Sequence, residues 1–281
     1  MTWFIFALIS IFAIAIANVY QKLAMRETES DPLAAGIFFQ LVLTLITGVF
    51  AFFYGFHAPP FSQFPFYFLN SAVFYAAGTF LIFKAIKEIE ASELVILTAF
   101  SAIITIAGGI IFLGEPFSLR QVLGTALILI AIIIVQKKTG LSGKWGMWLA
   151  LLGGSCYAVA VVSDTHILKT YDAVSYTPVM SLLPGIILLL FNPRVVTKLK
   201  SYVNATYVKN LSLYCFFYGI QAVCYYVALN KGANASQMAP LFRAEIILTV
   251  ILAVIFLRER EKIPLKIFGA IIAAVGVILL K

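Results

Sequence analysis

The sequence predicts an all-α polytopic membrane protein, with ten transmembrane helices in two inverted five-helix repeats. Three observations predict this fold class. The chain of 281 residues is 62% hydrophobic and only 11% charged, apolar stretches follow one another along it, and short patterns of its first half recur in its second half. A soluble domain carries about 25% charged residues, so the composition excludes that class.

Ten apolar stretches are each near the length, about 20 residues, that a helix needs to cross a hydrocarbon core of about 30 Å. Most connections between them are short, and Pro or Gly marks several of them. The longest connection, residues 192–210, is basic and is expected either as an amphipathic segment on the lipid surface or as a solvated loop. The ten stretches are 3–24, 33–56, 66–88, 91–113, 119–136, 145–167, 173–191, 211–231, 235–257 and 263–280.

The two halves of the chain match at a constant offset of 144 residues. An Ala-Ser pair opens the fourth and the ninth stretch, and a Phe-Leu-x-Glu pattern closes each of them. These anchors are Ala91-Ser92 with Phe112-Leu113-Gly114-Glu115, and Ala235-Ser236 with Phe256-Leu257-Arg258-Glu259. Apolar helices match one another easily by composition, so these anchors carry most of the comparison.

The match divides the chain into a first repeat at 1–136, a linker at 137–144 and a second repeat at 145–281. An odd number of spans in each repeat places the two repeats in opposite orientations. Inverted repeats are typical of secondary transporters, which bind their substrate near the membrane midplane between the repeats.

Two five-helix repeats with these anchors resemble the drug/metabolite transporter superfamily, in its EamA-like branch. The resemblance covers essentially the whole chain. It implies a central cavity lined by the first, third, fourth, sixth, eighth and ninth helices, with the fifth and tenth peripheral. The chain departs from the family pattern at Arg258, where Gly is usual, and at Ala102 and Arg243-Ala244-Glu245, where a mid-helix Pro is common.

Two ionisable residues, Arg243 and Glu245, lie near the centre of the ninth stretch. A charge at that depth costs at least about 2.5–3.5 kcal/mol and usually faces a bundle interior or a wet cavity. Residues two apart point about 200° from each other on a helix, so each needs its own partner. Arg243 either binds a carboxylate or phosphate of the substrate or forms a structural ion pair with Glu93 or Asp164. Glu245 either takes up a proton or binds a cationic group, or it neutralises charge on another helix.

Six further side chains complete the predicted substrate site. Two are amides deep in predicted spans, three are aromatic rings that can form cavity walls, and one is an acid near the start of the fourth stretch. The alternatives are that the amides join helices, that the rings face lipid and that the acid is interfacial. The six are Asn18, Gln221, Tyr75, Tyr157, Tyr225 and Glu93. Asp164 and His166, which close the sixth stretch, are expected near the lipid headgroups, with a proton relay as the alternative.

Enzyme, metal and cofactor signatures are not found in the sequence. It has no Ser-His-Asp constellation, no His-Glu-x-x-His, no Walker loop and no glycine-rich dinucleotide turn. Its three cysteines lie inside predicted spans and it has only two histidines, which supports neither a disulfide framework nor a zinc site. We therefore expect no enzyme activity and no cofactor. Its net charge of +8 is explained by membrane topology, so nucleic acid is not an expected partner.

The sequence therefore predicts a secondary transporter of a small polar organic metabolite, in the plasma (inner) membrane. Arg243 and Glu245 together suit a substrate with both charges, so an amino acid or related zwitterion is favoured, moved by alternating access. The alternatives are a carrier of organic anions, nucleotide sugars or drugs, and a non-transporting sensor or scaffold. The lipid bilayer is the other partner, the proton is the candidate coupling ion, and both a monomer and a homodimer are open.

The distribution of basic residues bears on orientation. The connections after the odd-numbered stretches hold 15 Lys and Arg, and the opposite side holds four. The positive-inside rule then places both chain ends outside the cytoplasm, whereas the family resemblance favours the reverse. The even number of spans places both chain ends on one side in either case.

Overall fold

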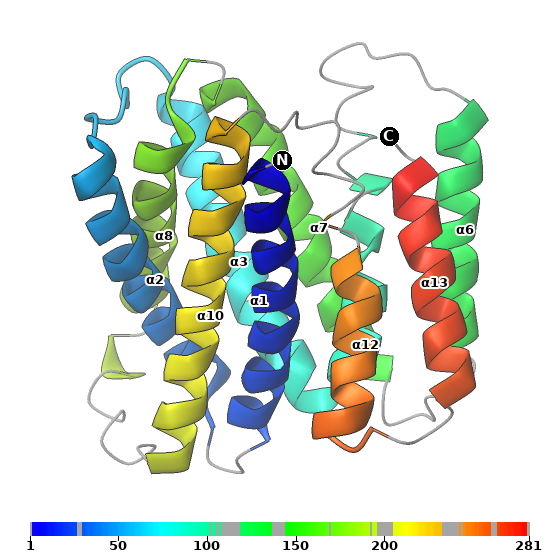
Figure 1. The fold of residues 1–281 in the computed structure, drawn as a ribbon. Coiled ribbons are helices and arrows are strands. Elements are labelled where there is room, and N and C mark those ends of the chain that lie inside the picture. Colours follow the sequence, from blue (N-terminus) through cyan, green and yellow to red (C-terminus); the bar gives the residue numbers. More distant parts are fainter. Residues whose placement is uncertain are drawn as a thin grey trace.

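A computed structural model gives the fold as a bundle of helices (Figure 1). It describes residues 2–26, 30–101, 103–104, 107, 119–136, 144–168, 170–191, 193–195, 205–231, 242, 244–259 and 263–279. Ten helices lie within these residues. They are α1 (Thr2–Met25), α2 (Pro32–Tyr54), α3 (Pro65–Glu88), α4 (Ala91–Thr98), α6 (Leu119–Gln136), α7 (Lys144–Ile167), α8 (Ala173–Phe191), α10 (Ala205–Asn230), α12 (Ala244–Phe256) and α13 (Ile263–Leu279).

The all-α, ten-helix prediction is confirmed. Five of the described helices, α1, α2, α3, α7 and α8, are long and apolar enough to cross a membrane. Local signals explain where helices begin and end. Asp31 caps α2, its carboxylate accepting hydrogen bonds from the amides of Leu33 (2.8 Å) and Ala34 (2.9 Å), and Pro32 occupies the first turn. The helix stops at Gly55, whose φ of 99° is the left-handed conformation that glycine adopts at little cost.

The start of α10 differs from the sequence prediction. We expected the eighth helix to begin at residue 211, but α10 begins at Ala205 and takes in the end of the expected loop. Tyr207 and Leu211 explain the difference, because both are buried in the bundle. Part of the expected surface segment is therefore an additional turn and a half of helix, in which Tyr207 is the buried side chain.

The main helix contacts are symmetric under exchange of the two halves. α1 packs on α10, and α7, the counterpart of α1 in the second repeat, packs on α3, the counterpart of α10. In three further contacts a helix packs on its own counterpart: α2 on α8, α4 on α12 and α6 on α13. The repeats are also inverted. Gly146, at the start of α7, lies against Glu88 and Ile89 at the end of α3, whereas α1 starts at the opposite end of the bundle. The two-repeat, inverted fold class is thus confirmed. Residues 137–143 of the predicted linker lie outside the described residues.

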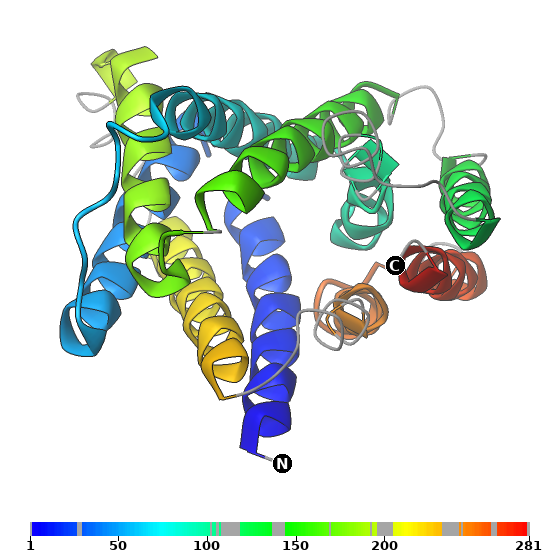
Figure 2. The same ribbon diagram turned by 90° about the horizontal axis from the view of Figure 1, so that it is seen from above.

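Two ends of the bundle can be distinguished, and we name them for use below. The termini end carries the start of α1 and the end of α13 (Figure 1). The basic end carries the end of α1, the junction of α3 with α4 and the junction of α12 with α13. Seen from above, α6 and α13 lie together at one edge of the bundle, in the peripheral position that the family resemblance implied (Figure 2). Large apolar side chains such as Phe53 and Phe191 are more than 80% exposed, as expected of a surface covered by lipid.

Candidate functional site

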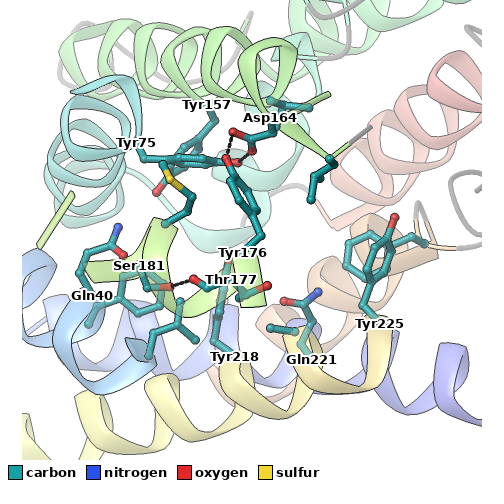
Figure 3. Close-up of a pocket in the computed structure, with 17 residues that line it drawn as sticks. Gln40, Tyr75, Tyr157, Asp164, Tyr176, Thr177, Ser181, Tyr218, Gln221 and Tyr225 are labelled. Atoms are coloured by element: carbon teal, nitrogen blue, oxygen red, sulfur yellow. Dashed lines mark hydrogen bonds between the residues drawn. The ribbon is translucent and has the colours of Figure 1, made fainter. Parts of the chain in front are cut away.

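A cavity of about 430 Å³ lies between α2, α3, α7, α8 and α10 (Figure 3). Its volume is in the range, about 300–1,000 Å³, of sites that bind small organic molecules. Its lining comes from both repeats, and it extends from the middle of the bundle toward the termini end, where Leu168 and Phe242 complete it. The contribution of α2 and α8 was not expected, because the family resemblance implied neither the second nor the seventh helix.

Aromatic rings form much of the cavity wall. Tyr75 of α3 and Tyr157 of α7 are neighbours, with ring centroids 5.7 Å apart. On the other side, Tyr225 of α10 meets Phe242 edge to face, at 5.6 Å. Such walls bind apolar bodies by contact and cations through the faces of the rings.

Polar groups interrupt the aromatic wall at defined points. The amide of Gln40 on α2 donates to the hydroxyl of Thr79 (2.8 Å), which in turn shares a hydrogen bond with the hydroxyl of Tyr157 (3.1 Å). This chain of hydrogen bonds joins α2, α3 and α7 at the cavity. Gln221 of α10 and Thr177 of α8 also line it (Figure 3). These groups give the cavity specific hydrogen-bonding positions within a largely apolar lining.

Among the described lining residues, the one carboxylate is that of Asp164, in the last turn of α7. Three hydroxyl groups surround it. Ser71 of α3 and Tyr176 of α8 donate to Oδ1, the latter at 2.5 Å, and Tyr75 of α3 donates to Oδ2 at 2.6 Å. The side chain is 7% exposed. Asp164 therefore holds three helices together and still faces the cavity. We name it, with its three hydroxyl donors, the hydroxyl cage.

Below the cavity, toward the basic end, four rings close the space between α2, α3 and α10. We name Phe39, Phe83, Tyr214 and Tyr218 the aromatic floor. Phe39 lies 4.8 Å from Tyr214 and 4.9 Å from Tyr218, and Phe83 lies 5.7 Å from Tyr214, measured between ring centroids. Phe39 and Tyr218 also line the cavity. The floor is therefore a packed layer between the cavity and the basic end.

A set of charged side chains lies beyond the floor, at the basic end. We name Lys22, Arg26, Glu90, Glu259 and Lys266 the charged clasp. Lys22 of α1 donates to the carbonyl oxygens of Ile86 (2.6 Å) and Ile89, at the end of α3. Lys266 of α13 is paired with Glu90. These contacts tie α1 to α3, and the start of α4 to α13.

The centre of the clasp is Glu259, which is 2% exposed. Its carboxylate accepts hydrogen bonds from the amides of Ala91 (2.9 Å) and Ser92 (3.2 Å) and from the hydroxyl of Ser92 (2.5 Å), so it caps α4 from the other repeat. Arg258, with a φ of 56°, makes the left-handed turn that places it there. Arg26 lies 4.0 Å from the same carboxylate and donates to the carbonyl of Leu257 (3.1 Å).

The predicted site residues are distributed unevenly. Tyr75, Tyr157, Gln221 and Tyr225 line the cavity together. Asn18 instead donates from α1 to the hydroxyl of Thr249 on α12, at 3.2 Å. Glu93 is buried in the first turn of α4, close to the clasp. Glu245 is half-buried in the first turn of α12 and is not among the residues that line the cavity. Arg243 lies outside the described residues.

Sequence reasoning missed the hydroxyl cage, since Asp164 was expected near the headgroups. A signal for it was present: Ser71 and Tyr75 are four residues apart, so they share one face of the third helix. Nothing in the sequence indicated that Tyr176 of α8 would complete the cage.

Comparison with known proteins identifies the family. The EamA-like transporter family matches residues 1–136 and again residues 144–281. The chain belongs to this family. EamA-like proteins are membrane transporters of small molecules with a ten-helix, two-repeat fold, and this chain is accordingly a multi-pass integral membrane protein of that class.

Two further similarities add little on substrate. An uncharacterized protein of Methanocaldococcus jannaschii is 37% identical over 70 residues, a match that covers 25% of this chain and about half, 51%, of that relative. A solved crystal structure aligns with a TM-score of 0.66 at 12% sequence identity and covers 98% of each chain. This second likeness supports the fold alone.

Proposed function

We propose that this EamA-like protein is a secondary transporter of an amino acid or a related small amine-bearing molecule, located in the plasma (inner) membrane. It works by alternating access around the cavity. The observation that carries the proposal is the cavity itself, which lies between the two repeats and is walled by rings and amides.

Alternating access is supported by the asymmetry of the two ends. The aromatic floor and the charged clasp lie between the cavity and the basic end, whereas the lining extends toward the termini end. Inverted repeats can exchange such conformations, which exposes the same site to the other side of the membrane. A substrate drives this exchange only through different affinities for the two conformations.

The composition of the lining favours an amine over an anion. Among the described lining residues there is one carboxylate, that of Asp164, and no Lys or Arg. Among the described lining residues, an organic anion would meet this carboxylate and no basic side chain. An amino acid also needs a partner for its own carboxylate. Arg243 directly follows Phe242, a lining residue, and we propose it for this role. The ammonium partner proposed here replaces Glu245 of the sequence hypothesis.

Uptake into proteoliposomes tests the proposal. Purified protein is reconstituted, and counterflow of radiolabelled phenylalanine, phenethylamine and 3-phenylpropionate is measured with and without a pH gradient. We expect counterflow of phenylalanine. An increase in accumulation with the pH gradient would show that protons are coupled. Counterflow of 3-phenylpropionate alone would replace the proposal by the organic-anion alternative, and counterflow of no compound in a wide metabolite panel would favour a sensor or scaffold.

A matched pair of variants controls for leak and misfolding. Ala222 lines the cavity and is 7% exposed, so Ala222→Phe fills part of the cavity and should abolish counterflow. Leu190 is 71% exposed on the lipid-facing surface, so Leu190→Phe adds a similar ring at a distance from the cavity. Equal loss of counterflow in both variants would contradict a transport route through this cavity.

A further inference from the structure

We infer that the hydroxyl cage is the binding site for the ammonium group of the substrate, with Asp164 as the residue that selects amines. This inference rests on the proposed function and names the chemistry by which the cavity recognises its substrate. Three steps carry it: the hydrogen bonds that Asp164 already accepts, the charge around it and the rings beside it.

The hydrogen bonds of the cage leave one position open. A carboxylate offers about four lone-pair positions on its two oxygens. Oδ1 of Asp164 accepts from Ser71 and Tyr176, and Oδ2 accepts from Tyr75. Within the described part of the chain Oδ2 accepts only from Tyr75, and Asp164 lies in the cavity wall, so the fourth position, on Oδ2, is the one available to a ligand. An N–H group of a substrate can donate a hydrogen bond to this position, whereas a substrate carboxylate, which only accepts hydrogen bonds, cannot.

The donors of the cage also favour the ionised form of the carboxyl group. All three neighbouring hydroxyls donate to Asp164, and a carboxylate accepts such bonds without competing to donate. A negative charge with this little exposure is costly unless a cation lies close to it. The described residues of the cavity lining include no Lys or Arg that could be that cation. In this inference, a substrate ammonium group is the cation that lies beside Asp164.

Other titratable groups near this end of α7 are directed elsewhere. His166, two residues after Asp164, stacks on the ring of Tyr67 with a centroid distance of 4.6 Å. His57 pairs with Asp172 at 3.3 Å outside the cavity lining. The two histidines of the chain therefore do not supply the counter-charge of the cage.

The rings around the cage suit the remainder of an amine substrate. Tyr75 and Tyr176 each donate a hydroxyl hydrogen bond to the carboxylate, so their rings lie beside Asp164 (Figure 3). An ammonium group bound to Asp164 would therefore have these rings as neighbours. Tyr157 lies beside Tyr75 and extends the wall toward the middle of the bundle. Such rings bind cations through their faces and apolar groups by contact. The geometry thus selects a primary or secondary amine on an apolar or aromatic body.

Three compounds with the same phenyl-alkyl skeleton separate the charges in a binding test. Phenethylamine carries an ammonium group only, 3-phenylpropionate a carboxylate only, and phenylalanine both. We expect purified wild-type protein to bind phenethylamine at least about tenfold more tightly than 3-phenylpropionate, since a hydrogen bond to a charged group is worth about tenfold or more in an equilibrium constant. Tighter binding of 3-phenylpropionate would overturn the inference.

Variants at two acids assign the effect to the cage. Asp164→Asn keeps the shape of the side chain and removes its charge, so the affinity for phenethylamine should fall at least about tenfold while that for 3-phenylpropionate does not fall. Asp172→Asn is the matched control, because it removes a carboxylate at the same end but outside the cavity lining. Binding of phenethylamine that is unchanged in Asp164→Asn, or reduced equally in Asp172→Asn, would refute the assignment.

A conservative variant protects the test against misfolding. Asp164→Glu retains the charge and should keep the preference for phenethylamine over 3-phenylpropionate, with weaker affinity; loss of that preference in a folded protein would count against the cage. The proposed function fails separately. If phenethylamine and phenylalanine bind in an Asp164-dependent manner but show no counterflow, the binding site stands and transport does not. If counterflow of phenethylamine and of phenylalanine is the same in wild type and Asp164→Asn, transport stands and the cage does not.

Discussion

Replacing Glu259 by Gln should open the basic end of the protein. The substitution keeps the size of the side chain but removes the negative charge that caps α4. The Gln oxygen can still accept from one or two of the groups on Ala91 and Ser92. The Gln amide, however, would point N–H groups at a backbone N–H, which leaves a buried donor unpaired. Arg26 loses little, because its side chain is 41% exposed.

The size of the effect follows from these losses. An unpaired buried donor costs about 1–3 kcal/mol, and loss of a negative charge at a helix N-terminus costs about 0.3–1 kcal/mol. A total of about 2 kcal/mol or more corresponds to about a 30-fold change in the ratio of closed to open conformations at this end. This free-energy cost raises the energy of the closed conformation, because Glu259 caps α4 in that conformation.

Cys215 is a native reporter of this opening. It is 0% exposed on α10, next to Tyr214 of the aromatic floor. The rate at which a water-soluble maleimide labels Cys215 is measured by mass spectrometry, which distinguishes it from Cys156 and Cys224. We expect labelling about 30-fold faster in Glu259→Gln than in wild type, at a temperature where circular dichroism shows intact helices.

The control variant for this experiment is Glu88→Gln. Glu88 is an exposed acid at the same end of the bundle, in the last turn of α3. The hydrogen bonds from Ala91 and Ser92 at the start of α4 go to Glu259 and not to Glu88. Its replacement should leave the labelling rate at the wild-type value. A wild-type labelling rate in folded Glu259→Gln would refute the reasoning, since the clasp would then not hold the basic end closed.

Three further predictions concern stability and are measured as shifts in Tm. Arg258→Gly should stabilise the protein by about 1 kcal/mol, because a φ of 56° strains any residue with a Cβ; a lower Tm would contradict this. Gly276→Ala should destabilise it by about 1–3 kcal/mol, because the new Cβ would lie 2.9 Å from a backbone oxygen of α6, and an unchanged Tm would show that the two helices are not in such close contact. Burial raises the pKa of Tyr171 to about 12, so its hydrogen bond to the carbonyl of His57 (2.7 Å) should stabilise the fold fully below pH 10 and be lost between about pH 10 and 12. Tyr171→Phe should remove that alkaline step, and persistence of the step would assign it to another group.

The helices could be predicted largely because a bilayer dictates their length. Apolar stretches of about 20 residues have one stable conformation in lipid, so the bounds of α1, α3 and α7 lie within two residues of those expected. The start of α10 could not be found in this way. Tyr207 and its polar neighbours look like a loop in the sequence, and only the packing of the bundle shows that the ring is buried.

The repeat anchors were identified in the sequence, but their meaning was not. Ala91-Ser92 and Glu259 are parts of two patterns that recur in both halves. The structure shows that these parts bind each other, which requires the pairing of α4 with α12. A linear pattern reveals that two segments are alike and does not reveal which of them meet.

The candidate site shows the same division. Tyr75, Tyr157, Gln221 and Tyr225 could be selected because deep polar and aromatic side chains on cavity helices have few other places to go. Asp164 was judged by its distance from the end of its helix, which is a poor measure of depth when side chains of α3 and α8 cover that end. Burial by neighbouring helices, which no single stretch encodes, decides the setting of this acid.

The pairing of helices across the two halves has a consequence for synthesis. α1 leaves the ribosome early, yet its principal neighbour α10 and the carboxylate that caps α4 are translated much later. At about 5–20 residues per second, α1 waits in the membrane for roughly ten seconds or more before α10 is made. During that time the amide groups at the start of α4 depend on water or on chaperones. Each half therefore needs the helices of the other half as packing partners. Two halves expressed as separate chains in the same cell should assemble into a stable protein, and each half expressed alone should be degraded.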